Sequence, residues 1–193
     1  MERAEEFELI EKAKSGDKKA IDKLVEEFAP MVFRFSFNVC RNQEKAEHTT
    51  QETFLSVLKK LHQFDNRSKF STWLYTIVSN HCFMLARKEK ANRFVSLDEE
   101  ESVMPEKTIT PWEESPLSRV EQGEIRRLLD EGIERLSPDY RIIFVLRDIE
   151  GLSTNEISKI TNLSVPAVKS RLHRARAFLR NFLTPYFAED LHD

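Results

Sequence analysis

Apolar residues recur at three- and four-residue intervals in two blocks of the chain, which is the spacing of amphipathic helices. In the first block the spacing predicts a helix that ends at Gly16, one that begins at Asp17, and one from about Pro30. The last is apolar on nearly all sides, so we expect it near the centre of the core. Two further helices are predicted, around residues 54–61 and 74–85.

Helix boundaries are marked more sharply in the second block. An amphipathic stretch over residues 125–136 is followed by residues that stop one helix and start the next. These signals are Ser137-Pro138, Gly151, a capping box from Ser153 to Glu156, Asn162 as a left-handed turn residue, and Ser164 as a cap. The second block is therefore predicted to contain several short helices and one long final helix.

Between the blocks, residues 94–120 show no sustained apolar periodicity. This segment holds three of the seven prolines and carries seven acidic against two basic residues, which is typical of a flexible linker. We therefore predict an all-α fold of two small helical domains, 1–93 and 121–193, joined by a flexible acidic linker, 94–120. The four glycines in 193 residues agree with this fold class, because many-stranded sheets and glycine-rich phosphate loops need more of them.

Composition excludes several classes of protein. Cys40 and Cys82 are too few for a disulfide framework or a four-cysteine zinc site, and we interpret them mainly as small core residues. The charged N-terminus predicts no signal peptide, and no apolar run approaches the ~20 residues of a membrane span. The five histidines are scattered, so we expect no metal site, no cofactor and no catalytic centre. We expect a cytoplasmic protein without membrane insertion.

The predicted helices 154–161 and 165–183 are separated by a three-residue turn, the pattern of a helix-turn-helix. In such motifs the second helix lies in the major groove of DNA. Residues 159–188 contain six basic residues and no acidic one, although the whole chain has a net charge of −3. Arg176 and Arg180 lie further along the helix and fit phosphate contacts. The alternative reading is an ordinary amphipathic helix with a solvated basic face.

Residues 64–88 form a second candidate surface. Basic and aromatic residues alternate there, and residues 67–93 have six basic residues against Glu89 alone. One helical face is predicted to present Trp73, Thr76, Asn80, Met84 and Arg87. Cations, aromatic faces and amide donors are the groups that bind single-stranded nucleic acid. Phe70 and Trp73 individually are better explained by core packing than by base stacking.

At these residues the chain resembles the extracytoplasmic-function sigma factors of the sigma-70 superfamily. Residues 51–55 (QETFL) resemble the segment that docks on the β′ clamp helices of RNA polymerase, and residues 70–80 (FSTWLYTIVSN) resemble the −10 recognition segment. Residues 147–153 (RDIEGLS) and 165–176 (VPAVKSRLHRAR) resemble the region that reads the −35 element. Lys45, His48 and Met84 depart from the acidic residues common in the family, and Asn162 replaces a common glycine.

The resemblance implies partners and three sets of binding residues. The partners are core RNA polymerase, through its β′ clamp helices and β flap, promoter DNA, and an anti-sigma factor. The polymerase-binding set is Gln51, Glu52, Phe54, Leu55 and Leu58. The −10 set is Phe64, Asn66, Arg67, Ser68, Lys69, Phe70, Trp73, Tyr75, Thr76, Asn80, Arg87 and Lys88, of which Phe64, 66–69 and Asn80 are expected to hold a flipped base. The −35 set is Ser164, Pro166, Ala167, Lys169, Ser170, Arg171, His173, Arg174 and Arg176.

A free-standing helix-turn-helix regulator is the alternative function; an enzyme and an adaptor without DNA binding are weaker ones. The regulator would bind paired half-sites as a dimer, yet the sequence offers no obvious dimerisation helix. Two promoter elements about two helical turns apart lie ~70 Å from each other. A relaxed linker of residues 94–120 spans only roughly 30 Å, so a rigid scaffold such as the polymerase must hold both domains.

Overall fold

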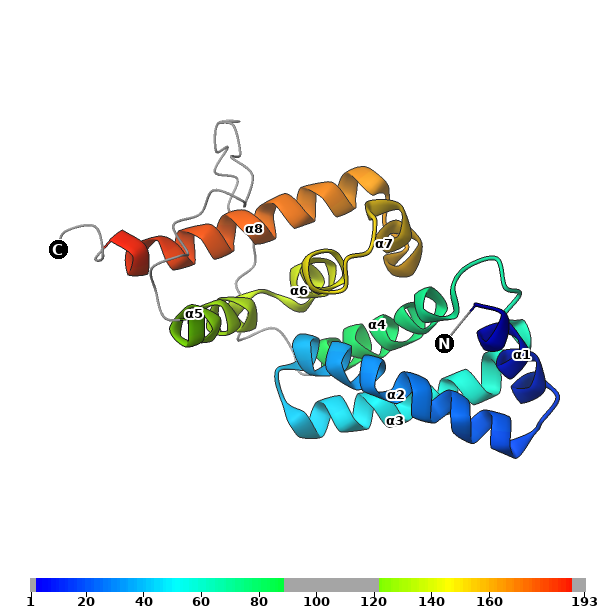
Figure 1. Ribbon diagram of the computed structural model, residues 1–193. Coiled ribbons are helices and arrows are strands. Elements are labelled where there is room, and N and C mark those ends of the chain that lie inside the picture. Colours follow the sequence, from blue (N-terminus) through cyan, green and yellow to red (C-terminus); the bar gives the residue numbers. More distant parts are fainter. Residues whose placement is uncertain (1–2, 89–121, 189–193) are drawn as a thin grey trace.

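The computed structural model describes residues 3–88 and 122–188, and these ranges contain helices and turns without a strand (Figure 1). The N-terminal module, residues 3–88, contains α1 (Arg3–Lys14), α2 (Lys18–Cys40), α3 (Gln43–Lys60), the single 3₁₀ turn η1 (Leu61–Gln63) and α4 (Phe70–Lys88). The C-terminal module, residues 122–188, contains α5 (Gln122–Arg135), α6 (Pro138–Phe144), the π-helical turn η3 (Val145–Ile149), α7 (Thr154–Thr161) and α8 (Val165–Ala188). The all-α prediction is confirmed, and the predicted linker 94–120 lies outside the described residues.

The predicted boundary between the first two helices is confirmed. Gly16 has a φ of 89°, the left-handed conformation that ends α1 without a Cβ clash. The carboxylate of Asp17 then accepts hydrogen bonds from the backbone N–H groups of Lys19 at 2.9 Å and Ala20 at 3.3 Å. These bonds satisfy two of the free amide donors at the start of α2.

The prediction that a separate helix begins near Pro30 is wrong, because α2 is continuous from Lys18 to Cys40 with Pro30 inside it. A proline within a helix removes one backbone hydrogen bond. Burial of Phe28 and Val32 on either side of it outweighs that loss. This part of α2 was expected near the centre of the core. Its outer side is not covered, however, since Phe37 is 40% exposed.

In the C-terminal module the predicted caps appear where the sequence places them. Ser137 occupies the N-cap position of α6, although its side chain makes no capping hydrogen bond, and Ser153 and Glu156 form a complete capping box at the start of α7. Gly151 has a φ of 73° and ends the preceding turn. The π-helical turn Val145–Ile149 before it was not predicted, because a π turn has no periodicity of its own in the sequence.

The two modules pack against each other, which the sequence did not predict. One buried hydrophobic cluster contains residues of α1 to α4 together with residues of α6, η3, α7 and α8. Figure 1 shows α4 lying next to α6 and α7, on the side of the N-terminal module that faces the C-terminal one. A second, smaller cluster joins α5, α6 and α8. Cys82 is buried in the shared cluster and Cys40 packs against it half-buried, as expected for core thiols.

Candidate nucleic-acid interface

The helix-turn-helix geometry of α7 and α8 is built by local hydrogen bonds. Asn162 adopts a φ of 56°, the left-handed conformation predicted for the turn. The Ser158 hydroxyl donates to the Leu163 carbonyl at 2.5 Å, which holds the turn against α7. The backbone N–H of Ala167 donates to Ser164 Oγ at 3.3 Å and so caps α8. The angle between the two helices is therefore fixed within a few residues.

The predicted −35 residues lie along the outer side of α8. Most of the set is exposed, whereas Ala167 and Arg171 are half-buried. Lys169, His173, Arg176 and Arg180 line one shallow hollow of about 200 Å³. Arg176 also forms an ion pair with Asp148, its Nε lying 3.1 Å from Oδ2. The surface is open to a ligand, although the Arg176 guanidinium is already paired with the Asp148 carboxylate.

Aromatic rings hold the loop of residues 64–69 at the start of α4. The rings of Phe64, Phe70 and Trp73 lie 5.2–5.5 Å apart, centre to centre. Phe64 and Phe70 are buried and Trp73 is half-buried, so core packing is the main role of the first two. The Lys14 ammonium lies 5.7 Å from the Phe64 ring centre, which adds a cation–π contact from α1.

A hollow of about 370 Å³ lies beside this loop, and we call it the loop pocket. It is lined by Glu6, Phe7, Ile10, Phe64, Asn66, Ser68 and Lys69. Four of these residues were predicted to surround a flipped base. Arg67 and Asn80 were expected there too, but neither is among the lining residues. Ten helical residues from Phe70 place Asn80 about 15 Å along α4. The structure thus separates Asn80 from the rest of the predicted pocket.

The α1 wall of the loop pocket was missed by sequence reasoning. Asn66 has a φ of 61°, and its side-chain amide donates to Glu11 Oε1 at 3.2 Å. That contact joins residues 55 positions apart. No spacing rule could have found it, since nothing in the sequence of α1 distinguishes this glutamate from its neighbours.

The predicted DNA face of α4 is partly open. Asn80, Met84 and Arg87 are exposed, and Trp73 and Thr76 are half-buried. On the adjacent side, Tyr75 is buried and donates a hydrogen bond to Glu150 Oε2 at 2.6 Å. Burial, followed by the bond to Glu150, raises the pKa of the Tyr75 phenol. Tyr75 is thus engaged by the C-terminal module and not by solvent.

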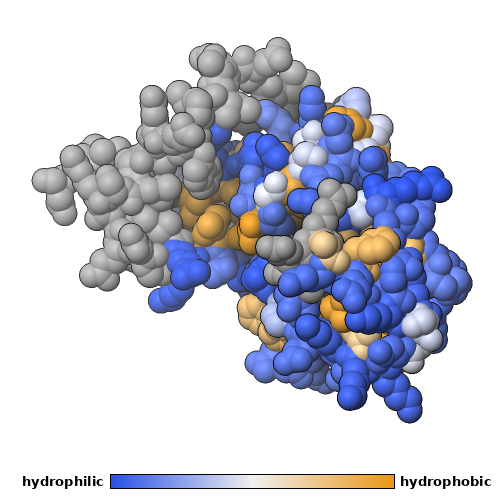
Figure 2. Space-filling model, turned by 45° about the vertical axis from the view of Figure 1, so that its right-hand side comes forward, coloured by the Kyte–Doolittle hydropathy of each residue, from blue (hydrophilic) through white to orange (hydrophobic). Residues whose placement is uncertain are grey.

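The predicted polymerase-binding residues lie on α3. Leu55 and Leu58 are exposed by 50% and 43%, Gln51 is exposed and Glu52 is half-buried. Phe54 points inward and belongs to the hydrophobic core. Two large apolar side chains left on one helix face are suited to contact with another protein. Most of the face visible in Figure 2 is hydrophilic, with separate small apolar patches.

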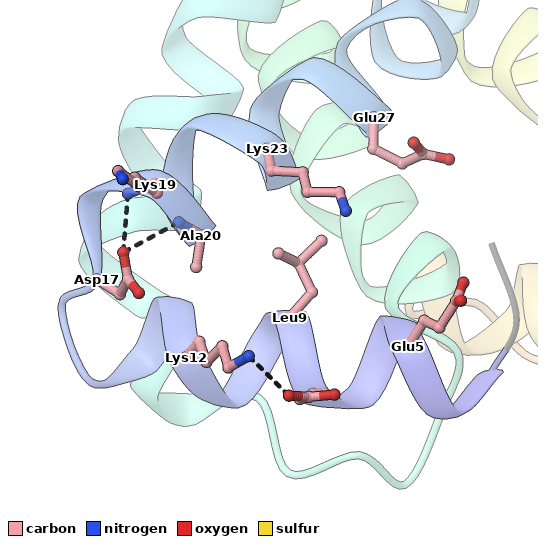
Figure 3. Close-up of a pocket in the computed structure, with 9 residues that line it drawn as sticks. Glu5, Leu9, Lys12, Asp17, Lys19, Ala20, Lys23 and Glu27 are labelled. Carbon is pink, nitrogen blue, oxygen red and sulfur yellow. Dashed lines mark hydrogen bonds and ion pairs between the residues drawn. The ribbon is translucent and has the colours of Figure 1, made fainter.

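A further hollow, of about 580 Å³, lies between α1 and α2 (Figure 3). Three of its charged side chains serve local structure, because Lys12 pairs with Glu8 at 2.6 Å and Asp17 caps α2. Within residues 3–88 and 122–188, no three His, Cys, Asp or Glu side chains are grouped as metal ligands. No helix in the described part of the chain combines the length and apolar character that a membrane span requires.

Comparison with known proteins gives concordant matches. Residues 24–92 match the family model for sigma-70 region 2, and residues 126–179 match that for sigma-70 region 4. The chain is 31% identical over 180 residues to the ECF RNA polymerase sigma factor SigW of Bacillus subtilis, covering 90% of this chain and 94% of that one. It is 32% identical over 178 residues to the ECF RNA polymerase sigma factor SigE of Mycolicibacterium smegmatis, covering 91% and 67%.

The fold is shared with solved structures, and two of them illustrate this. One is CnrH in complex with the cytosolic domain of CnrY, with a TM-score of 0.65, 24% identity, and coverage of 93% of this chain and 97% of that one. The other is the sigma factor RpoE in complex with the anti-sigma factor NepR from Bartonella quintana, with a TM-score of 0.61, 23% identity, and coverage of 86% and 98%.

Proposed function

Because the chain belongs to the ECF RNA polymerase sigma factors, we propose that it directs core polymerase to promoters by reading the −35 element with α8 and the −10 element with the loop pocket and α4. The observation that carries this proposal is the exposed basic side of α8, held by a capped helix-turn-helix. A helix so presented fits the major groove, and its cations fit the flanking phosphates.

The −10 element is read as single-stranded DNA in this proposal. An unstacked base costs a few kcal/mol to extrude, so the protein needs a pocket that binds it. The loop pocket offers the Asn66 amide, the Lys69 ammonium and the Glu6 carboxylate beside apolar walls, in a volume of about 370 Å³. The exposed Asn80 and Arg87 on α4 then contact neighbouring nucleotides of the same strand.

Core polymerase is bound by α3. Leu55 and Leu58 supply apolar contact and Gln51 and Glu52 supply polar contact at one end of the same face. An interface with a small apolar centre and a polar rim is usual for complexes that form and dissociate. As a subunit of the polymerase without a catalytic centre of its own, the protein acts in the cytoplasm.

An anti-sigma factor is the proposed regulator. Two of the solved structures that share this fold are complexes, and the partner of RpoE is described as an anti-sigma factor. A partner of that kind would block the surfaces of α3, α4 or α8 that the polymerase and the promoter need.

Run-off transcription with core polymerase of the same organism and genomic fragments tests the proposal. Active core polymerase that initiates nowhere in response to the protein would refute it.

On a promoter found in this way, Asn80→Ala should impair strand opening more than it impairs polymerase binding. Strand opening is measured by the permanganate reactivity of the DNA. Asn181→Ala is the matched control, since Asn181 is also an exposed helical asparagine. Equal effects of the two substitutions would remove Asn80 from the −10 surface.

A further inference from the structure

The two cysteines of the chain, which the proposed function does not use, lie together in the N-terminal module. Cys40 is the last residue of α2, and Cys82 is a buried residue of α4, which packs against α2. Both residues line one small hollow of about 30 Å³, whose other walls are Val39, Lys45, Leu85, Ala86, Pro138 and Arg141. A volume of this size has room for about one water-sized molecule. The hollow therefore brings both thiols of the protein to one place.

The two thiols contact each other but differ in their surroundings. A hydrogen bond with Cys40, followed by burial, raises the pKa of the Cys82 thiol. Cys82 is only 2% exposed, so its thiol stays protonated and out of reach of solutes. Cys40 is half-buried, and its Sγ lies 3.9 Å from Thr49 Oγ1. Cys40 is therefore the thiol that a small oxidant reaches first.

A buried cation lies beside Cys40. Burial, followed by the charge of Arg41, lowers the pKa of Arg141 to about 10, so Arg141 stays protonated near neutral pH. The charge of Cys40 acts on this pKa in the opposite direction, because the thiol and the guanidinium are near each other. Arg141 is held there by a hydrogen bond of 2.6 Å to the Val39 carbonyl. A cation next to a thiol favours the thiolate, which is the nucleophilic form.

Adjacent thiols can hold a metal ion or form a disulfide. A structural zinc site needs four protein ligands. In the described ranges, 3–88 and 122–188, no group of three His, Cys, Asp or Glu side chains could supply them. Lys45 and Arg141 in the walls of the hollow would also repel a divalent cation. The hollow therefore suits oxidation of the thiols and not metal binding.

We propose that Cys40 and Cys82 are a redox-active thiol pair, in which Cys40 reacts with hydrogen peroxide and Cys82 then closes a reversible disulfide. The Cys40 thiolate attacks one peroxide oxygen, the O–O bond breaks, and the other oxygen leaves as hydroxide, which takes up a proton to become water. The Cys82 sulfur attacks the sulfur of the resulting sulfenic acid, the S–O bond breaks, and hydroxide leaves as water with the Cys82 proton. The thiols lose two electrons, the peroxide gains them, and the products are one disulfide and two waters.

The disulfide protects the protein against irreversible damage. A sulfenic acid without a partner thiol is oxidised further to a sulfinic acid, whereas a disulfide is restored by reduction. In a reducing compartment both thiols stay reduced until an oxidant appears. The bond joins the end of α2 to α4 and so closes the chain segment that contains α3 and the loop of residues 64–69. This inference does not depend on the proposed function.

Hydrogen peroxide added to the purified, full-length protein tests the inference. Reduced thiols are counted with a chromogenic disulfide reagent in denaturant, and linked peptides are identified by mass spectrometry without reduction. Both thiols should disappear together, one bond should join Cys40 to Cys82 of the same chain, and dithiothreitol should restore both. Thiols that persist in peroxide, or a disulfide that joins two chains, would overturn the inference. The wild-type protein suffices for this measurement, so its result does not depend on the folding of a variant.

Cys82→Ser/Ser79→Cys is the matched control. Ser79 is buried in the same helix, so this variant keeps two thiols and the burial of the second one. The exchange moves that thiol by three residues, or about 4.5 Å along α4. A disulfide requires Cβ atoms about 3.5–4.5 Å apart, so the disulfide should form at least about tenfold more slowly than in the wild type. Equal rates would show that the arrangement in the hollow does not join the thiols, and the inference would fail.

The single variants test the order of the two steps. In Cys82→Ala, dimedone should trap a sulfenic acid on Cys40, and after excess peroxide dithiothreitol should not restore the Cys40 thiol. In Cys40→Ala, Cys82 should remain reduced under the same treatment, because it is buried and its thiol stays protonated. Thermal melts of both variants check that each is folded. Dimedone labelling of Cys82 in place of Cys40 would overturn the assigned roles.

Discussion

The basic side chains of α8 should strengthen promoter binding through contacts with phosphates, and this contribution should weaken as the salt concentration rises. Lys169, Arg176 and Arg180 lie on one side of the helix, and the first and last are eleven residues apart. At 1.5 Å per residue this strip is about 16 Å long. The major groove is about 12 Å wide, so the two ends of the strip reach the phosphates on its two edges. We therefore predict that Lys169 and Arg180 are phosphate contacts.

Each neutralised phosphate contributes about −0.9 to the slope of log K against log salt concentration. Replacing both residues, in Lys169→Ala/Arg180→Ala, should make the slope of holoenzyme binding less steep by about 1.8. Between 50 and 200 mM salt, the ratio of the wild-type affinity to the variant's affinity should therefore fall roughly 12-fold. Fluorescence anisotropy of a labelled promoter duplex, titrated with holoenzyme at several salt concentrations, measures it.

The matched control is Lys18→Ala/Lys23→Ala, which removes two exposed cations from α2, far along the chain from α8. It has the same net charge as the test variant, so it corrects for the effect of total charge. Parallel slopes for the wild type and the α8 variant, or an equal loss of slope in the control, would refute the assignment. An affinity loss that does not vary with salt would mean that the two residues act through stability or base contact.

Three further predictions concern other surfaces and the turn. Leu55→Asp should weaken binding to core polymerase at least tenfold, or about 1.4 kcal/mol, without lowering the melting temperature, because Leu55 is 50% exposed; equal loss of both would make it a packing residue. Ser153 lowers the pKa of Glu156 below 4.5, so the stability that Glu156 contributes over Glu156→Gln should be complete above about pH 4.5 and decline as pH falls below it; a difference that is constant from pH 3 to 7 in thermal melts would contradict this. Asn162→Ala should destabilise the protein by about 1 kcal/mol in denaturant titrations, because alanine lacks the short polar side chain that lets asparagine adopt the left-handed φ of 56°, whereas Asn162→Gly should not, because glycine has no Cβ to penalise there; equal costs would show that the left-handed backbone conformation is not what sets the cost.

Local signals in the sequence were sufficient for much of this structure. Asp17, Ser153 and Asn162 act through bonds or dihedral angles within a few residues, so their roles can be derived without the fold. The basic side of α8 likewise follows from helical spacing alone. Pro30 is the exception among local signals, because packing on both sides carried the helix through it.

What the sequence by itself determined is the all-helical fold, most of the helices and their caps, and the basic and aromatic surfaces that identify a sigma factor. Only the tertiary structure decided which of those surfaces are available. Glu11 reaches Asn66, and Glu150 reaches Arg34 and Tyr75, over 55 to 116 residues. The physical reason is that side-chain periodicity reports which face of a helix is apolar, whereas it carries no information about which distant segment covers that face.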